Sequence, residues 1–245
     1  MSKLDEYRSE LKALDDWMPF LLRRSGLPGP RGNLELAQAV AELAKPDQVE
    51  RLLATPPKEA PENSPGVFLV FCGVTALGKM AASGRQQDFR RLRMYASDER
   101  WRVREAVAIG LQYVGDADML LLLDRLKVWL AGNWYEKRAA AAALAEPRLL
   151  KDTDITQRVL AVFDQITADI ASSPLPHDES FKVLRQAMGY CWSVAVAALP
   201  QDGKPLMQRW LRSSDPDVLW VMRENLKKKR LQKMDAGWVA RWQGK

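Results

Sequence analysis

Apolar residues recur at helical spacing along most of this chain. Between residues 103 and 114 they fall at positions i, i+3, i+4, i+7, i+8 and i+11, and residues 119–130 and 155–170 behave similarly. Such spacing places the apolar side chains on one stripe of an α-helix. No segment shows the sustained alternation of apolar and polar residues that is typical of a half-buried strand. The pattern therefore predicts an all-α chain of about ten short-to-medium helices joined by short turns.

Proline residues mark the most irregular part of the chain. Residues 56–65 contain four prolines, a composition that indicates an exposed loop or a linker. We therefore divide the chain into an N-terminal helical section at 1–55, a loop at 56–65, and a helical repeat region at 66–245.

Two of the predicted helices carry a clear signal at their N-terminus. Ser64 precedes Pro65, and Asp215 precedes Pro216. A Ser or Asp side chain at the N-cap accepts a hydrogen bond from a backbone N–H of the first turn, and proline suits the first helical position. We expect one helix to begin at each of these prolines.

One eight-residue pattern occurs twice in the chain. Residues 98–105 and 217–224 share Asp, Trp, Arg and Glu at identical spacing, and a weaker echo relates residues 134–144 to residues 101–111. A helical unit that recurs with a period in the thirties to forties is typical of a solenoid. In a solenoid each repeat buries its apolar face on the next one.

The segment from Asp98 to Ala106, which places Trp, Val, Arg and Glu at the head of a helix, resembles HEAT repeats. The best match covers about residues 85–145, and a second covers about 204–230. The resemblance implies an α-solenoid of HEAT-like antiparallel helix pairs, a right-handed superhelix whose inner helices line a concave surface. Proteins with HEAT-like repeats include scaffolds, nucleic-acid binders, phycobilin lyases and a family of alkylpurine DNA glycosylases.

The repeated pattern has a structural and a functional interpretation. In the structural one, the two aspartates lie in or near the first helical turn and face the positive end of the helix dipole. Trp101 and Trp220 then pack between helices, while Arg104 and Arg223 pair with the acid of a neighbouring repeat. In the functional one, the arginines face the concave surface and bind a ligand. The sequence leaves both interpretations open.

Positive charge is concentrated toward the C-terminus. The chain has a net charge of +6, and residues 204–245 contain 11 Lys and Arg against 4 Asp and Glu. On a helix, Arg223, Lys227 and Arg230 would share a face. Basic side chains near tryptophans suit nucleic acid, because cations neutralise phosphates and rings stack on bases. The alternative is a solvated or protein-binding face.

Residues 133–139 partly resemble the motif of the HEAT-like alkylpurine DNA glycosylases, in which two aromatic residues precede an acid and a second acid follows three residues later. Trp134 and Tyr135 fill the aromatic places and Glu136 the first acid place, while Ala139 stands at the second. The resemblance implies that Glu136 would stabilise positive charge on the sugar as the base leaves. The alternative is an amphipathic helix start that packs Trp134 in the core.

Other catalytic and metal-binding signals are sparse. Two cysteines and a single histidine are too few for a structural zinc site, which takes four ligands mostly from these residue types. Cys72 and Cys191 lie in apolar runs, so we expect two buried thiols and no disulfide framework. His177 lies in a predicted loop as a surface residue or, alternatively, a catalytic base. We find no Gly-rich phosphate loop and expect no metal and no cofactor.

The sequence also bears on membrane association. The N-terminus is charged and lacks an apolar signal region. The longest apolar stretches, residues 66–78 and 187–199, fall short of the ~18 residues that suggest a membrane span. We therefore expect buried helices in a cytoplasmic protein without a membrane partner.

These observations lead to one main functional hypothesis and one alternative. The main hypothesis is a non-enzymatic HEAT-repeat scaffold whose basic concave surface binds a protein or a nucleic-acid backbone. The alternative is a DNA repair activity like that of the alkylated-base glycosylases, with Glu136 as the candidate catalytic residue. The candidate nucleic-acid contacts are Arg100, Arg104, Trp134, Tyr135, Arg138, Arg223, Lys227 and Arg230.

Overall fold

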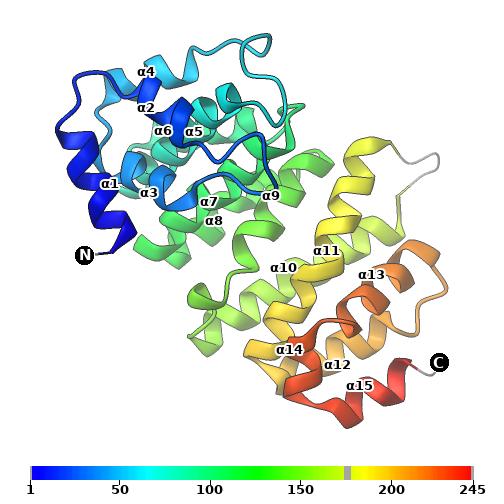
Figure 1. Cartoon of the computed structure of the whole chain (residues 1–245). Helices are drawn as coiled ribbons and strands as arrows, with labels where there is room; N and C mark the ends of the chain where they lie inside the picture. The colour runs from blue at the N-terminus through cyan, green and yellow to red at the C-terminus, as the bar shows by residue number, and fades with distance from the viewer. Residues whose placement is uncertain (1, 174–177, 244–245) are drawn as a thin grey trace. The chain divides into compact units, whose positions relative to one another are not determined.

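The computed structural model describes residues 2–173 and 178–243, and every regular element in these ranges is helical (Figure 1). The predicted all-α class is therefore confirmed. The described residues form 15 α-helices and one 3-10 helix, more than the ten or so expected. Part of the excess consists of helices of six to eight residues, such as α14, which are too short to produce a periodic apolar pattern.

The chain divides into two compact units, Met1–Asp118 and Met119–Lys245. The irregular stretch that joins α4 to α5, which contains most of the predicted loop 56–65, lies inside the first unit. The seven helices of the first unit are α1 (Lys3–Lys12), α2 (Met18–Arg24), α3 (Leu34–Leu43), α4 (Pro46–Leu53), α5 (Pro65–Ala82), α6 (Gln86–Tyr95) and α7 (Trp101–Ala117).

Alternate helices of the first unit pack on one another. Helix α1 contacts α3, α3 contacts α5, and α5 contacts α7, so the odd-numbered helices form a continuous row. Helices α2, α4 and α6 each pack against α5 as well. Helix α5 is therefore the centre of this unit, and 14 of its 18 residues are buried.

The apolar composition of α5 follows from this central position. Its length and composition are sufficient to cross a membrane, the one such case among the described helices, but 78% of it is buried inside the structure. A helix that is apolar on all sides is also typical of the centre of a larger helical protein. The expectation of a buried helix at residues 66–78 is confirmed.

Two glycines allow α5 and α7 to approach closely. A Cβ atom at Gly78 of α5 would lie 2.1 Å from the Cα atom of Gly110 in α7. No residue with a side chain fits at that distance from a neighbouring backbone. The tight contact between the two helices therefore requires glycine at position 78.

The second unit contains eight α-helices and a short 3-10 helix among its described residues. They are α8 (Met119–Leu130), α9 (Trp134–Leu144), η1 (Pro147–Leu149), α10 (Thr153–Ala171), α11 (Glu179–Ala198), α12 (Pro200–Trp210), α13 (Pro216–Leu226), α14 (Lys229–Met234) and α15 (Ala236–Gln243).

Helices of the second unit also pack in alternate rows. One row consists of α9, α11 and α13, in which α11 contacts both of its neighbours. A second row consists of α8, α10 and α12, and successive members of this row are in contact. Helix α11 is central, because it also contacts α10, α12 and α14 (Figure 1). Its buried residues include Phe181, Trp192 and Cys191.

Several local predictions are confirmed by the structure. Ser64 accepts a hydrogen bond from the Val67 backbone N–H at 3.4 Å, and Pro65 is the first residue of α5. Asp215 accepts one from the Val218 N–H at 2.8 Å, at the start of α13. Both cysteines are free and buried, as their apolar surroundings predict.

Candidate nucleic-acid interface

The two copies of the repeated sequence pattern occupy different helical positions. Trp101 is the first residue of α7, whereas Trp220 is the fifth residue of α13. Asp217 lies in the first turn of α13 and Asp98 lies just before α7, so both are in or near the first helical turn, as expected. Identical spacing in the sequence therefore does not give these residues identical local roles.

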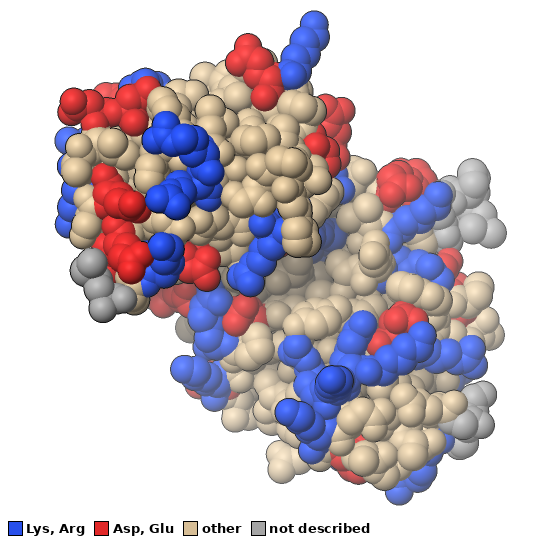
Figure 2. Space-filling view, viewed as in Figure 1, with Lys and Arg blue, Asp and Glu red and all other residues tan. Residues whose placement is uncertain are grey.

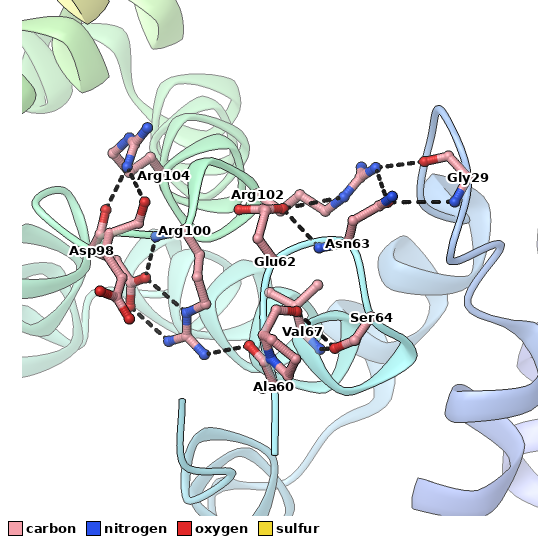
Figure 3. A network of polar contacts seen from close by, with 12 residues as sticks. Gly29, Ala60, Glu62, Asn63, Ser64, Val67, Asp98, Arg100, Arg102 and Arg104 are labelled. Carbon is pink, nitrogen blue, oxygen red and sulfur yellow. Dashed lines mark hydrogen bonds and ion pairs between the residues drawn. The ribbon is translucent and has the colours of Figure 1, made fainter. Parts of the chain in front are cut away.

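All hydrogen bonds that the structure describes for the Arg100 side chain are to residues of the first unit. Its side chain forms a two-point ion pair with Asp98, with Nη2–Oδ2 at 2.7 Å and Nε–Oδ1 at 2.8 Å. Its Nη1 also donates a hydrogen bond to the carbonyl oxygen of Ala60 at 3.2 Å (Figure 3). Arg100 is only 6% exposed, so it joins the turn before α7 to the preceding loop.

Arg102 and Arg104 extend the same network. Arg102 donates from Nη2 to the Gly29 carbonyl at 2.7 Å and to Asn63 Oδ1 at 3.0 Å. Arg104 donates from Nη1 to the main-chain carbonyl of Asp98 at 2.6 Å (Figure 3). Both side chains are buried. These guanidinium groups satisfy backbone carbonyls that would otherwise be left without donors.

Trp101 departs from the expectation that it packs between helices. Its side chain is 42% exposed, and the guanidinium carbon of Arg102 lies 4.4 Å from its ring centroid. As the first residue of α7 it lies beside the loop that holds Pro57 and Pro61, with which it lines a shallow surface hollow.

Side chains at the start of α9 contact residues of α10 and α11. The half-buried Trp134 packs edge-to-face against Phe181 of α11, with ring centroids 5.5 Å apart. Lys137 lies over the Trp134 ring at 5.0 Å and forms an ion pair with Asp169 of α10. This arrangement agrees with the packing interpretation of Trp134.

The other candidates at α9 are also half-buried. Tyr135, Glu136 and Arg138 each have intermediate exposure, and the backbone N–H of Glu136 donates to the N-cap residue Asn133 at 3.0 Å. Arg138 lies close enough to Cys191 to affect that thiol electrostatically. His177 lies outside the described residues.

Basic charge is segregated between the two units. The first unit has 17 Lys and Arg against 17 Asp and Glu, whereas the second has 20 against 14. The whole net charge of +6 therefore belongs to the second unit. Lys and Arg side chains gather on this unit over α11, α13 and α14 (Figure 2).

We call the side chains that these three helices present the basic face. Arg223 and Lys227 are exposed, and the helical spacing of Trp220, Arg223, Glu224 and Lys227 places them on one side of α13. The basic face consists of Lys182, Arg185, Gln186, Tyr190, Trp220, Arg223, Glu224, Lys227, Lys228 and Arg230.

Arg230 and Tyr190 join α14 to α11 on the basic face. The guanidinium carbon of Arg230 lies 4.6 Å from the centroid of the Tyr190 ring, and the same side chain donates a hydrogen bond to the Tyr190 hydroxyl. Tyr190 is 42% exposed, although it lies in the central helix of this unit. An exposed ring beside a cation is a feature of surfaces on which nucleic-acid bases stack.

A hollow of about 490 Å³ opens on the basic face between α11 and α13. Its lining carries three cationic side chains, one carboxylate and one indole ring. The lining residues are Lys182, Arg185, Gln186, Gly189, Trp220, Glu224 and Lys228. Glu224 forms an ion pair with Lys227, which reduces its repulsion of an anion in the hollow.

A buried asparagine fixes α13 against α11 behind this face. Asn225 donates from Nδ2 to the Met188 carbonyl at 2.7 Å and accepts from the Ser193 N–H at 2.7 Å. Its side chain has no solvent exposure. A buried side-chain amide that loses its hydrogen-bond partners lowers the stability of the fold, so these bonds hold the two helices in one register.

Cys191 lies under the same surface. Burial raises the pKa of its thiol to about 12, against the opposing influence of Arg138 and Arg230. Burial also raises the pKa of Cys72 well above its usual range. Both thiols are therefore protonated at neutral pH and unsuited to nucleophilic chemistry.

The part of the basic face that lies on α11 was not identified from the sequence. The C-terminal charge pointed to Arg223, Lys227 and Arg230, whereas Lys182 and Arg185 were not among the candidates. These two residues are three positions apart on α11, so they share a helix side, and that spacing was the available signal. Their proximity to α13 depends on tertiary packing.

Comparison of this chain with protein-family models, with curated proteins and with solved structures finds no match.

Proposed function

We propose that this chain is a non-enzymatic binding scaffold of HEAT-like antiparallel helix pairs, and that its second unit binds the phosphate backbone of nucleic acid. The alternate packing of α9, α11 and α13 in one row and of α8, α10 and α12 in another supports the first part. Two parallel rows of alternate helices are what stacked helix pairs of an α-solenoid produce.

The observation that carries the proposed ligand is the basic face. Of the large apolar side chains that are exposed among the described residues of the second unit, only Tyr190 lies on it. The buried core of a protein–protein interface is depleted of charged residues, lysine among them. A face on which lysine and arginine side chains outnumber carboxylates therefore favours a polyanion over a protein partner.

The proposed phosphate contacts differ from those expected from sequence. Arg223, Lys227 and Arg230 are retained, together with Arg138 of α9. Arg100 and Arg104 are omitted because they are buried and bound within the first unit. The contacts added from the structure are Lys182 and Arg185 of α11, and Lys228 of the C-terminal basic run lines the same hollow.

We do not propose the glycosylase-like activity. The half-buried Trp134 packs edge-to-face against Phe181 and lies under Lys137, which agrees with the packing interpretation of this helix start. Position 139, where the resemblance would require a second acid, is a fully buried alanine.

Charge reversal on the basic face tests the proposal. The variant carries Glu in place of Lys227, Lys228, Lys229 and Arg230, and its binding to labelled single-stranded and duplex DNA is measured by fluorescence anisotropy. Loss of several phosphate contacts should weaken binding by more than about tenfold at moderate salt.

A matched variant separates a local effect from a change in total charge. It carries Glu in place of Lys127, Arg148, Lys151 and Arg158, four exposed basic residues on other elements of the same unit. The proposal requires this variant to lose much less affinity. Equal loss in both variants would remove the basic face from the explanation.

A further inference from the structure

Arg185 is held in place by two contacts within the hollow of the basic face. Its guanidinium carbon lies 4.0 Å from the centroid of the Trp220 ring. Its Nε lies 2.7 Å from Oδ1 of Asp217 in an ion pair. The Arg185 side chain is 27% exposed and the Asp217 side chain 21%. The ring supports one face of the guanidinium group. The Asp217 carboxylate lies beside Nε as an ion-pair partner, although Nε makes no hydrogen bond of good geometry with any described residue.

Gly189 makes room for the ring that supports Arg185. A Cβ atom at this position would lie 3.1 Å from Cζ3 of Trp220 and 3.2 Å from Cβ of Glu224. Glycine in the interior of a long helix such as α11 is ordinarily unfavourable. Here it allows the indole of Trp220 to lie close against α11, one turn beyond Arg185.

The two Nη groups of Arg185 have no protein partner among the residues that the structure describes. Arginine presents its Nη and Nε hydrogens in a rigid planar fork, and two of them can bind two oxygens of one phosphate. Lys182, Gln186 and Lys228 line the same hollow and add donors around this fork. The Lys182 ammonium has one distant ion pair, 3.8 Å from Glu179.

We propose that this hollow is a phosphate-binding subsite for single-stranded nucleic acid, with Arg185 as its central contact. This inference rests on the proposed function, because it assigns one phosphate of the bound chain to a particular place. Asp217 and Trp220 are positioning residues that hold the guanidinium group before the ligand arrives, which lowers the entropic cost of binding.

The shape of the site selects a single strand over a duplex. A volume of about 490 Å³ is in the range of small-ligand sites, about 300–1,000 Å³, and accommodates a phosphate with part of its nucleotide. A flexible strand can bend a phosphate into the hollow and stack a base on the exposed Tyr190 ring nearby. A duplex keeps its bases paired and its backbone stiff, so it meets only the outer lysines.

The test compares Arg185→Gln with Arg158→Gln, which removes an exposed arginine on α10. Affinity for a fluorescent single-stranded oligonucleotide and for a duplex of the same length is measured by anisotropy. Arg185→Gln should weaken single-strand binding by about tenfold and duplex binding by less than about threefold. Arg158→Gln should change either affinity by less than about twofold.

Arg185 contacts Trp220, so the Arg185→Gln variant could alter local packing as well as phosphate binding. A second variant distinguishes these two effects. Lys228→Gln leaves that stack and the Asp217 ion pair intact, and it should weaken single-strand binding by about threefold and reduce the salt dependence. Equal losses on both ligands would overturn the single-strand preference. If neither variant loses affinity, the phosphate subsite is refuted but the proposed function is not. If the unaltered protein binds neither the single strand nor the duplex, both the subsite and the proposed function are refuted.

Discussion

Gly78 is the residue on which the packing of the first unit depends most directly. Its missing side chain allows the α5 backbone to lie against Gly110 of α7. Helices that pack this closely keep their axes together along several turns, and α5 is in contact with five of the other six helices of its unit. The stability of the first unit should therefore be sensitive to a single methyl group at this position.

Substitution of Gly78 by alanine should lower the free energy of unfolding by about 1–3 kcal/mol. The added Cβ meets backbone atoms of Gly110, which cannot move aside as a flexible side chain can. Urea unfolding followed by circular dichroism measures this change.

Gly237→Ala in α15 is the matched control. A Cβ atom there meets only a side-chain oxygen of Asp235, at 3.7 Å. Alanine should be neutral or slightly stabilising at this helical position, by up to about 1 kcal/mol. A Gly78→Ala variant as stable as this control would refute the close-approach argument.

For individual residues, the sequence predicts helix N-caps correctly, but it does not show which arginine side chains are buried. The caps at Ser64 and Asp215 were predictable, because an N-cap bond involves residues only three positions apart. Arg100, Arg104 and Arg223 look alike in the sequence, yet the first two are buried and the third is exposed. The difference arises from the partners of each side chain. Arg100 donates to the carbonyl oxygen of the distant Ala60, and Arg104 donates to the main-chain carbonyl oxygens of Asp98 and Glu99.

Among the secondary-structure elements and their connections, the loop between α4 and α5 is held in place by hydrogen bonds that can be named residue by residue. It contains no helix between residues 54 and 64, and its composition predicts an exposed loop or a linker. In the structure this segment is a loop that Arg100 holds at Ala60 and Arg102 holds at Asn63 (Figure 3). Two side chains from one helix start therefore attach it to the first unit.

Replacement of Arg102 by leucine should release this loop selectively. The exposed Lys58 within it is a cleavage site for a lysine-specific protease, and its cleavage should accelerate by at least about threefold as local opening becomes easier. Mass spectrometry of timed digests measures the rate at this site.

Arg90→Leu, at an exposed position of α6, is the control for the loss of one arginine. Its cleavage at Lys58 should match that of the unaltered protein. If Arg102→Leu accelerates cleavage at every lysine equally, the effect is global destabilisation and the specific role of Arg102 is refuted.

Long helices were predictable because their periodic apolar residues repeat over several turns. The pattern within residues 103–114 falls inside α7, and the one within 155–170 falls inside α10. The six-residue α14 has too few turns for such a pattern. Its basic run was visible in the sequence, but its placement against α11 through Arg230 and Tyr190 was not.

At the scale of the whole molecule, the principal feature is the unequal charge of the two units. The first is neutral overall and uses arginines to bind its own loops and turns, while the second carries the entire net charge of +6. The C-terminal excess was evident in the sequence. The contribution of α11 required the structure, because Lys182 and Arg185 approach Lys228 only through the packing of α11 and α13.

The salt dependence of binding to a labelled single-stranded oligonucleotide is the most direct test of nucleic-acid binding by the basic face. If at least four phosphates are neutralised, the logarithm of the association constant should fall against the logarithm of the salt concentration with a slope of about −3 or steeper. Absence of binding at low salt, or binding that is indifferent to salt, would contradict the proposal.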